Sequence, residues 1–322
     1  MNQHSTNGRG VHRRSVLRAV ALGAPLAAAG AFGVHAASAD TPNFKIMVTE
    51  QVTNKVFVFD KSKSFSNANA YKTWSPGVGG WYNLSDCRIR DTAQFGAIGL
   101  AAGSGGKVGI WNITTEKDQE LNDVLWSASP GGNPHALERI PNVGAFVSAS
   151  SSGFLTVYAP TKVSDPSTLK AVQTVNLAGA RGVLWDPNGK LLWVAAQKLV
   201  RAYSVTGTYR NTRIKATSKS VALSGNGHDI QPDYSNSGRL LVSDTYGVYS
   251  IDKSTLARTT LHTVRRIKSY VKMSSGEHFY VKGDDIGTRT WGSPTVAFSQ
   301  SADRTRSGAE FYKARYYTTA YN

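Results

Sequence analysis

The feature that most constrains the fold of this chain is an internal repeat with a period of roughly 47 residues. Four units align well: "SDCRIRDTAQFGAIGLAAGSGGKVGIWNITT", "PHALERIPNVGAFVSASSSGFLTVYAP", "ARGVLWDPNGKLLWVAAQKLVRAYSVT" and "GHDIQPDYSNSGRLLVSDTYGVYSIDK". A weaker unit, "IKSYVKMSSGEHFYVKGDD", follows them, and a partial unit beginning "FKIMVTEQVTNKVFVFD" precedes them. Each unit consists of short runs rich in Val, Ile, Leu, Tyr and Thr, separated by turn-forming residues, which is typical of β-strands.

A period of this length with four strands per unit is typical of β-propeller blades. We therefore predict an all-β fold, a single β-propeller over residues 40–322 with about six four-stranded blades. Five or seven blades are alternatives, because the N-terminal unit lacks a clear first strand. The C-terminal "EFYKARYYT" resembles "AYKTWSP" of the partial unit and is predicted to be an outer strand near the closure. A β-sandwich would have no reason to repeat at this period, and no Pro-, Ser- or Gly-rich linker divides the chain.

Residues 1–39 have the pattern of a twin-arginine signal peptide and are left out of the fold argument. Arg13 and Arg14 precede an apolar, Ala-rich run, and Ala37-Ser38-Ala39 forms a small-residue cleavage site. The alternative is a membrane anchor, but Gly and Pro interrupt the apolar run. We expect a secreted, extracellular protein that is monomeric and has no membrane contact after cleavage. The single cysteine, Cys87, excludes an intramolecular disulfide.

The chain is strongly basic, with 37 Lys and Arg against 21 Asp and Glu. Four of the basic residues and none of the acidic ones fall in residues 1–39, which leaves a net charge of +12 for the rest. This charge either serves solubility or attracts an anionic partner. No nucleic-acid recognition motif accompanies it, so an acidic polysaccharide is the expected partner and nucleic acid is not.

The aligned units begin with ionisable residues, and in a propeller the first strand of each blade lines the central channel. We therefore predict a ring of five side chains at one mouth of the channel: Asp86, His135, Arg181, His228 and Lys268. The alternative is that these polar groups only hydrogen-bond neighbouring strands and tie the blades together.

This ring suits proton abstraction next to a carboxylate, as in β-elimination from a uronate. Arg181 would bind the substrate carboxylate as a bidentate partner, and Lys268 and Asp86 would complete the binding site. A neutral histidine would accept the proton. His228 is the predicted base, with Asp229 orienting its ring, and His135 the predicted acid or hydrogen-bond donor; a tyrosine could also protonate the leaving oxygen.

Other chemistries have less support. The ring has one acid, whereas a glycosidase needs two, and no G-x-S-x-G motif is present. His135, His228 and Asp86 could supply three metal ligands, yet Arg181 and Lys268 would place two cations beside the ion. No cofactor or metal is therefore predicted, with a divalent metal kept as an alternative.

Aromatic residues near the ring are candidate platforms for sugar rings, although each could equally be packing. The candidates are Trp81, Tyr82, Tyr234 and Tyr270.

The chain resembles an uncharacterised family of exported actinobacterial β-propeller proteins. The resemblance covers the chain after the signal and is carried by "VTNKVFVFD", "NPHALERIP", "GVLWDPNGKLLWV", "GHDIQP" and "DRTRSGAEFYKARYY". In architecture and residue type it is also similar to propeller-fold polysaccharide lyases that use His, Tyr and Arg at the channel mouth, which is an analogy of fold and not of motif. The first resemblance implies a histidine where this chain has Arg181, and the departure weakens a three-histidine metal site.

Three functions follow from these patterns. The first is a secreted polysaccharide lyase that cleaves a uronate-containing glycan by β-elimination. The second is a non-catalytic propeller that binds acidic glycan or cell-wall polymer, and the third is a protein-interaction scaffold, which would expose an apolar patch. Convergence of a histidine with the Arg181 and Lys268 pair would favour the lyase over the other two.

Overall fold

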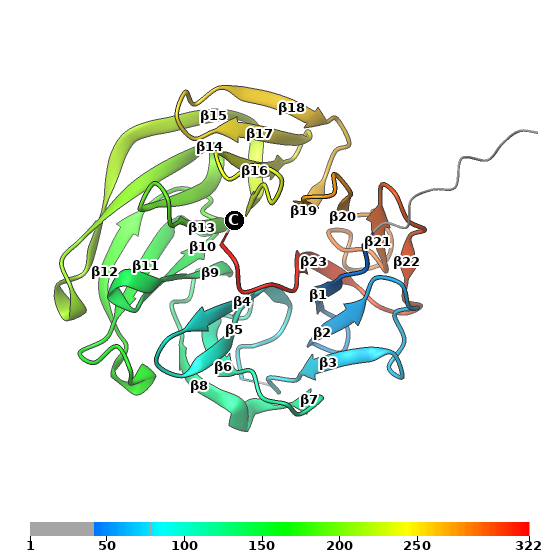
Figure 1. Ribbon diagram of the computed structural model, residues 1–322, viewed down its shortest axis with the longest axis horizontal. Coiled ribbons are helices and arrows are strands. Elements are labelled where there is room, and N and C mark those ends of the chain that lie inside the picture. Colours follow the sequence, from blue (N-terminus) through cyan, green and yellow to red (C-terminus); the bar gives the residue numbers. More distant parts are fainter. Residues whose placement is uncertain (1–41, 78, 322) are drawn as a thin grey trace, which may run out of the picture. The chain divides into compact units, whose positions relative to one another are not determined.

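The strands of the computed structural model surround a central axis as a β-propeller (Figure 1). The structure describes residues 42–77 and 79–321, and the predicted signal, residues 1–39, lies outside them. The strands form five hydrogen-bonded sheets. None of the helices in the described part of the chain is long and apolar enough to cross a membrane.

The first two sheets contain the N-terminal strands. The first sheet has the order β23 (Phe311–Tyr316), β1 (Lys45–Glu50), β2 (Lys55–Asp60), β3 (Ala70–Trp74) and β7 (Asp118–Gln119). The second has the order β4 (Leu84–Thr92), β5 (Gly96–Gly103), β6 (Lys107–Asn112) and β8 (Val124–Ala128).

The other three sheets follow in chain order. The third consists of β9 (Pro134–Ile140), β10 (Ala145–Ser150), β11 (Phe154–Ala159) and β12 (Lys170–Asn176). The fourth consists of β13 (Gly182–Asp186), β14 (Leu191–Thr206), β15 (Arg213–Pro232), β16 (Arg239–Asp244), β17 (Val248–Asp252) and β18 (Arg258–His262). The fifth consists of β19 (Ile267–Lys272), β20 (His278–Lys282), β21 (Thr295–Phe298) and β22 (Arg304–Thr305). Short 3₁₀ turns lie at Leu121–Asp123, Pro141–Val143, Pro166–Thr168 and Tyr209–Asn211.

The all-β propeller is confirmed, and five sheets lie within the predicted range. The fourth sheet joins two repeat units because β14 and β15 are long. β13 pairs with Leu191–Ala195 of β14, whereas β15 pairs with residues 197–206 of that strand. At the start of the second part, where the register shifts between Gln197 and Leu199, Lys198 adopts a φ of 56°, as a tight turn requires. The end of β15, residues 227–232, then pairs with β16 and begins the His228 unit.

Apolar side chains fill the space between neighbouring sheets, as the alternation in the repeat requires. Trp74 of β3 stacks on Trp111 of β6 with ring centroids 4.2 Å apart, which joins the first two sheets. Cys87 is buried in the same cluster, and burial raises the pKa of its thiol. The packing leaves the inner edges of the sheets to line the axis.

The C-terminal strand corrects the prediction for "EFYKARYYT". β23 is the innermost strand of the first sheet, where it pairs antiparallel with β1 on the channel side. It supplies the first strand that the N-terminal unit lacks. The similarity to "AYKTWSP" is misleading because it rests on aromatic residues, whereas Lys313 and Arg315 of β23 point into the axis and are buried there.

The channel is filled by charged side chains that we call the axial ion cluster, namely Asp86, Arg88, Asp229, Lys313 and Arg315. Arg315 binds both oxygens of Asp229, at 2.7 and 2.8 Å, and also contacts Asp86. Lys313 lies 3.2 Å from Asp229. Burial opposes ionisation of Asp86, but Arg315, Lys313 and Arg88 outweigh it and hold its pKa at about 2. Strands from three sheets are thereby tied together at the axis.

Replacing Arg315 by Leu should destabilise the fold strongly, because it leaves two buried carboxylates short of their main counter-charge. Removing one partner of a buried ion pair costs about 3–5 kcal/mol. Urea unfolding of Arg315→Leu beside the parent measures the loss. Arg239→Leu, at the exposed start of β16, is the matched control and should unfold like the parent. Equal losses in both variants would contradict a closing role for the cluster.

Candidate functional site

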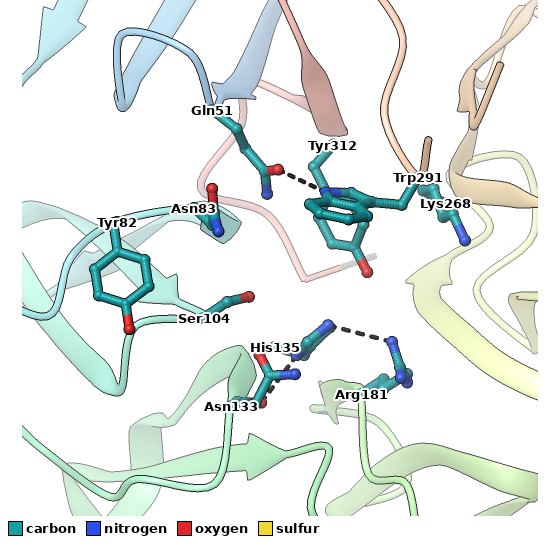
Figure 2. Close-up of a pocket in the computed structure, with 10 residues that line it drawn as sticks. All are labelled: Gln51, Tyr82, Asn83, Ser104, Asn133, His135, Arg181, Lys268, Trp291 and Tyr312. Carbon is teal, nitrogen blue, oxygen red and sulfur yellow. Dashed lines mark hydrogen bonds between the residues drawn. The ribbon is translucent and has the colours of Figure 1, made fainter. Parts of the chain in front are cut away.

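A cavity of about 420 Å³ opens at one mouth of the channel. Figure 2 shows its lining, which includes three of the five predicted ring residues, His135, Arg181 and Lys268. The remaining lining residues are Gln51, Tyr82, Asn83, Ser104, Asn133, Trp291 and Tyr312. None of these ten residues is acidic, so the cavity is positively charged.

β-Bulges place the ring residues. His135, His228 and Lys268 each lie on the innermost strand of their repeat unit, at a point where the register with the next strand shifts. Each is therefore an extra residue without a partner in the strand pairing. Arg181 comes directly before the paired part of β13. A bulge frees one residue from the alternation of the strand and redirects its side chain. The repeat therefore delivers the side chains of four blades to the same mouth.

His135 bridges the backbone and a cation. Its Nδ1 lies 2.9 Å from the carbonyl oxygen of Asn133, and its Nε2 lies 3.2 Å from Nη1 of Arg181. A carbonyl only accepts and a guanidinium only donates, so Nδ1 carries the proton and Nε2 presents its lone pair to Arg181. Burial, reinforced by the Arg181 charge, lowers the pKa of His135 to about 3. The imidazole is therefore neutral at physiological pH.

His228 and Lys268 form a second pair of imidazole and cation. Lys268 Nζ lies 3.4 Å from His228 Nε2, and burial followed by the charges of Arg181 and Arg266 lowers the pKa of Lys268 to about 8. Burial and the nearby cations also hold the pKa of His228 well below its usual range. His228 is not among the residues that line the cavity, and its buried side chain lies beside Lys268.

Asp229 does not orient His228, contrary to the prediction. The Asp229 carboxylate is engaged by Arg315, Lys313 and Gln231. The Nδ1 atom of His228 is buried and has no hydrogen-bond partner among the described residues.

Asp86 is in the axial ion cluster and not in the ring at the mouth, which corrects its predicted position. The bulge in β4 falls on Ser85, one residue earlier, so Ser85 is the equivalent of His135. Ser85 donates a hydrogen bond to the carbonyl of Pro134 at 2.6 Å. The predicted alignment of this unit is therefore shifted by one residue. It places Asp86 with the other ionisable residues, whereas Ser85 occupies the equivalent position.

Tyr312 is a member of the ring that sequence reasoning missed. It lies in the bulge of β23, and its ring meets that of His135 edge to face with centroids 5.8 Å apart. Burial raises the pKa of its hydroxyl, and the Arg181 charge opposes the rise. Aligning "FYK" of β23 with "PHA" and "IKS" identifies it, whereas the prediction of an outer strand places Tyr312 away from the channel.

Of the aromatic candidates, only Tyr82 lines the cavity, with 59% of its surface exposed. Trp81 is fully buried and meets Trp74 edge to face, because its side chain points into the core between two sheets. Tyr270 is buried and stacks on His278. Tyr234 packs against Tyr316, and both residues contact the core of the first and fifth sheets.

Trp291 is a second missed residue, and it lies in the loop between β20 and β21. Its indole nitrogen donates to Gln51 Oε1 at 2.8 Å, and Gln51 Nε2 donates in turn to the carbonyl of Leu84 at 2.9 Å. The bonds fix the edge of the indole ring at the rim of the cavity (Figure 2). With 38% of its surface exposed, it is the most exposed of the tryptophans.

A comparison with protein families matches residues 38–320 to a family of unknown function (DUF6528). The chain belongs to this family. No curated protein matches the chain. The match covers the whole propeller, so the cavity lies within the part of the chain that the family shares.

A divalent metal at the mouth of the channel would need at least three acidic, cysteine or histidine side chains close together. Residues 42–77 and 79–321 contain no group of three or more His, Cys, Asp or Glu side chains that could hold a metal ion. Asp86 in particular is bound to Arg315 and Lys313 in the axial ion cluster.

The neutral histidines should make stability depend on pH. The unfolded chain takes up a proton at His135 near pH 6.5, whereas the folded protein does so only near pH 3. The unfolded state therefore binds more protons below pH 6.5, and lowering the pH destabilises the fold. Between pH 6.5 and 5, above the range in which carboxylates titrate, His135 should contribute a loss of about 1–2 kcal/mol.

The measurement is urea unfolding at several pH values for the parent and for His135→Asn, whose amide can keep the hydrogen bond to Asn133 but does not titrate. The variant should lose less stability over this interval. An identical pH dependence in the two proteins would contradict a neutral, buried His135.

Proposed function

We propose that this protein is a secreted polysaccharide lyase that cleaves a uronate-containing glycan by β-elimination. The observation that carries the proposal is the convergence of Arg181, Lys268, His135 and Tyr312 on one cavity. His135 and Arg181 are in direct contact, well within the span of a single sugar ring. A channel whose polar residues only tied blades together would need no such cationic opening.

Arg181 is the proposed anchor for the uronate carboxylate. Its guanidinium matches a planar carboxylate as a bidentate donor, and Lys268 adds a point charge. When the C5 proton leaves, charge develops on this carboxylate, and cations already in place stabilise it. Neither cation is engaged in an ion pair within the described residues, and Arg181 and Lys268 contact His135 and His228 instead.

His135 is the proposed base, in place of His228. It lines the cavity, and its Nε2 lone pair is held by the residue that would turn to the substrate. Once Arg181 binds the carboxylate, Nε2 is free to accept the C5 proton, and the Arg181 charge, which adds to the effect of burial in lowering the pKa of His135, is neutralised. His228 lies beside Lys268, and its proposed role is to hold that amine in position.

Tyr312 is the proposed acid. Its hydroxyl has a raised pKa and is therefore protonated at neutral pH. It can give its proton to the glycosidic oxygen as the C4–O bond breaks, which leaves an unsaturated uronate and a new reducing end. The balance is one proton from C5 to His135 and one from Tyr312 to the leaving oxygen.

The second candidate is a propeller that binds acidic glycan without cleaving it. The basic excess outside residues 1–39 and the absence of acidic residues from the cavity lining favour this function as much as the first. The two differ in whether His135 and Tyr312 affect turnover or only affinity.

The lyase is tested with a panel of uronate-containing polysaccharides, following the absorbance of the unsaturated product. His135→Ala should reduce turnover about 10²–10⁴-fold with little loss of binding, the usual contribution of a general base. Tyr312→Phe should behave in the same way, and Arg181→Lys should lose activity although the charge is kept. His228→Ala should raise KM more than it lowers kcat.

The control is Arg239→Lys, far from the cavity at the exposed start of β16, with folding checked for every variant. Full activity in both His135→Ala and Tyr312→Phe would exclude the reaction proposed. Binding of an acidic polymer without product across the panel would leave the binding propeller as the better account.

Binding of an acidic polymer should weaken as salt rises, because exposed charges are screened beyond a Debye length of about 10 Å at 0.1 M. The double variant Arg181→Gln with Lys268→Gln should bind less tightly at low salt and depend less on salt. Calorimetric titration at about 0.05 to 0.5 M NaCl, over which the screening length falls from roughly 14 to roughly 4 Å, measures both effects. Affinity independent of salt in the parent would mean that the basic charge serves solubility alone.

A further inference from the structure

The cavity has two chemically different halves (Figure 2). Arg181 and Lys268 lie on one side of the view, and Tyr82, Asn83 and Ser104 lie on the other. His135 and Tyr312 lie between them. One half therefore offers positive charge, and the other offers an aromatic ring with uncharged hydroxyl and amide groups.

From this division we infer that the substrate is a glycan in which a uronate alternates with an uncharged sugar. The uronate would occupy the half with Arg181 and Lys268, and the uncharged sugar the half with Tyr82. The inference rests on the proposed function for the identity of the anion, and it adds the class of sugar on the other side of the bond.

The uncharged half is held rigidly. The backbone amide of Gly105 donates to the carbonyl of Tyr82 at 3.1 Å, and that of Ser104 donates to the carbonyl of Asn83 at 3.0 Å. Asn83 has a φ of 52°, a left-handed conformation that asparagine tolerates better than most residues. The two segments that form this half are thus fixed to each other before any ligand arrives.

Tyr82 has the geometry of a sugar platform. One part of its ring lies against Gly105, where an added Cβ would come within 2.5 Å of Tyr82 Cε1. The absence of a side chain at position 105 lets one edge of the ring approach the backbone closely, while 59% of the residue is exposed. A rigid aromatic ring with a free surface binds apolar faces at a low entropic cost.

A second uronate would be poorly accommodated in this half. Arg289 reaches Asn83 Oδ1 at 3.4 Å but does not line the cavity, so no lining cation is available to a second carboxylate. A carboxylate that is desolvated without a partner is costly, whereas sugar hydroxyls match the amide and hydroxyl groups there. The scissile bond would then lie between the halves, opposite His135 and Tyr312.

The inference is tested by calorimetric titration with two tetrasaccharides at about 0.15 M salt, where charge more than about 8 Å away is screened. One alternates glucuronate with N-acetylglucosamine, and the other is a homopolymer of galacturonate. The parent should bind the alternating oligomer at least about tenfold more tightly, a difference of about 1.4 kcal/mol. Tyr82→Ala should abolish this preference by weakening the binding of the alternating oligomer much more than that of the homopolymer.

Tyr71→Ala is the matched control, because Tyr71 is similarly exposed, at 48%, and lies on β3 away from the cavity. It should keep the preference. A parent that binds the homopolymer equally well or better would overturn the inference, as would a Tyr82→Ala variant that loses affinity for both oligomers alike. Neither result contradicts the proposed lyase activity, which is tested separately by the unsaturated product formed from either polymer. Binding of neither oligomer would overturn both.

Discussion

The structure depends on the neutralisation of two buried carboxylates at its axis. Asp86 and Asp229 come from different sheets, and the charges that balance them come mainly from Lys313 and Arg315 of the C-terminal strand. The strand that completes the first sheet, β23, therefore also neutralises the buried negative charge at the axis. Buried ion pairs are seldom a source of net stability, but a buried charge without its partner is strongly destabilising. The pattern thus favours one closed arrangement over any in which β23 is displaced.

The same strand positions the cavity. Lys313 Nζ donates to the carbonyl oxygens of His135 and Arg181, at 3.1 and 3.4 Å, directly beneath their side chains. Tyr312, the residue before it, faces His135. The bulges redirect the side chains at the mouth, and the axial ion cluster fixes the backbone from which they project. Structure and proposed chemistry are therefore coupled through the last strand of the chain.

The repeat was enough to predict the propeller and to gather His135, Arg181, His228 and Lys268 from distant positions. It was not enough to predict which side chains face the cavity, because strand alternation fails at a bulge and a shift of one residue separates Ser85 from Asp86. Tyr312 was missed because β23 pairs with a strand more than 260 residues earlier, which no local pattern reveals. Trp81 and Tyr82 are adjacent in the sequence, yet Trp81 is buried in the core and Tyr82 is exposed at the rim of the cavity. The turn at Asn83 determines which of the two side chains faces the cavity.

The distribution of charge suggests how binding of a substrate carboxylate and proton abstraction by His135 would be linked. Among the described residues, Asp86 and Asp229 are engaged within the axial ion cluster and Glu138 of β9 binds Arg90, whereas Arg181 and Lys268 at the mouth contact neutral imidazoles. An imidazole lone pair is a weaker partner for a guanidinium than a carboxylate is, since a carboxylate carries a full negative charge and accepts two parallel hydrogen bonds. An arriving carboxylate should therefore displace His135 from Arg181. In the proposed reaction this exchange binds the substrate and frees the base in one step, so that Nε2 of His135 becomes available only when a C5 proton is beside it.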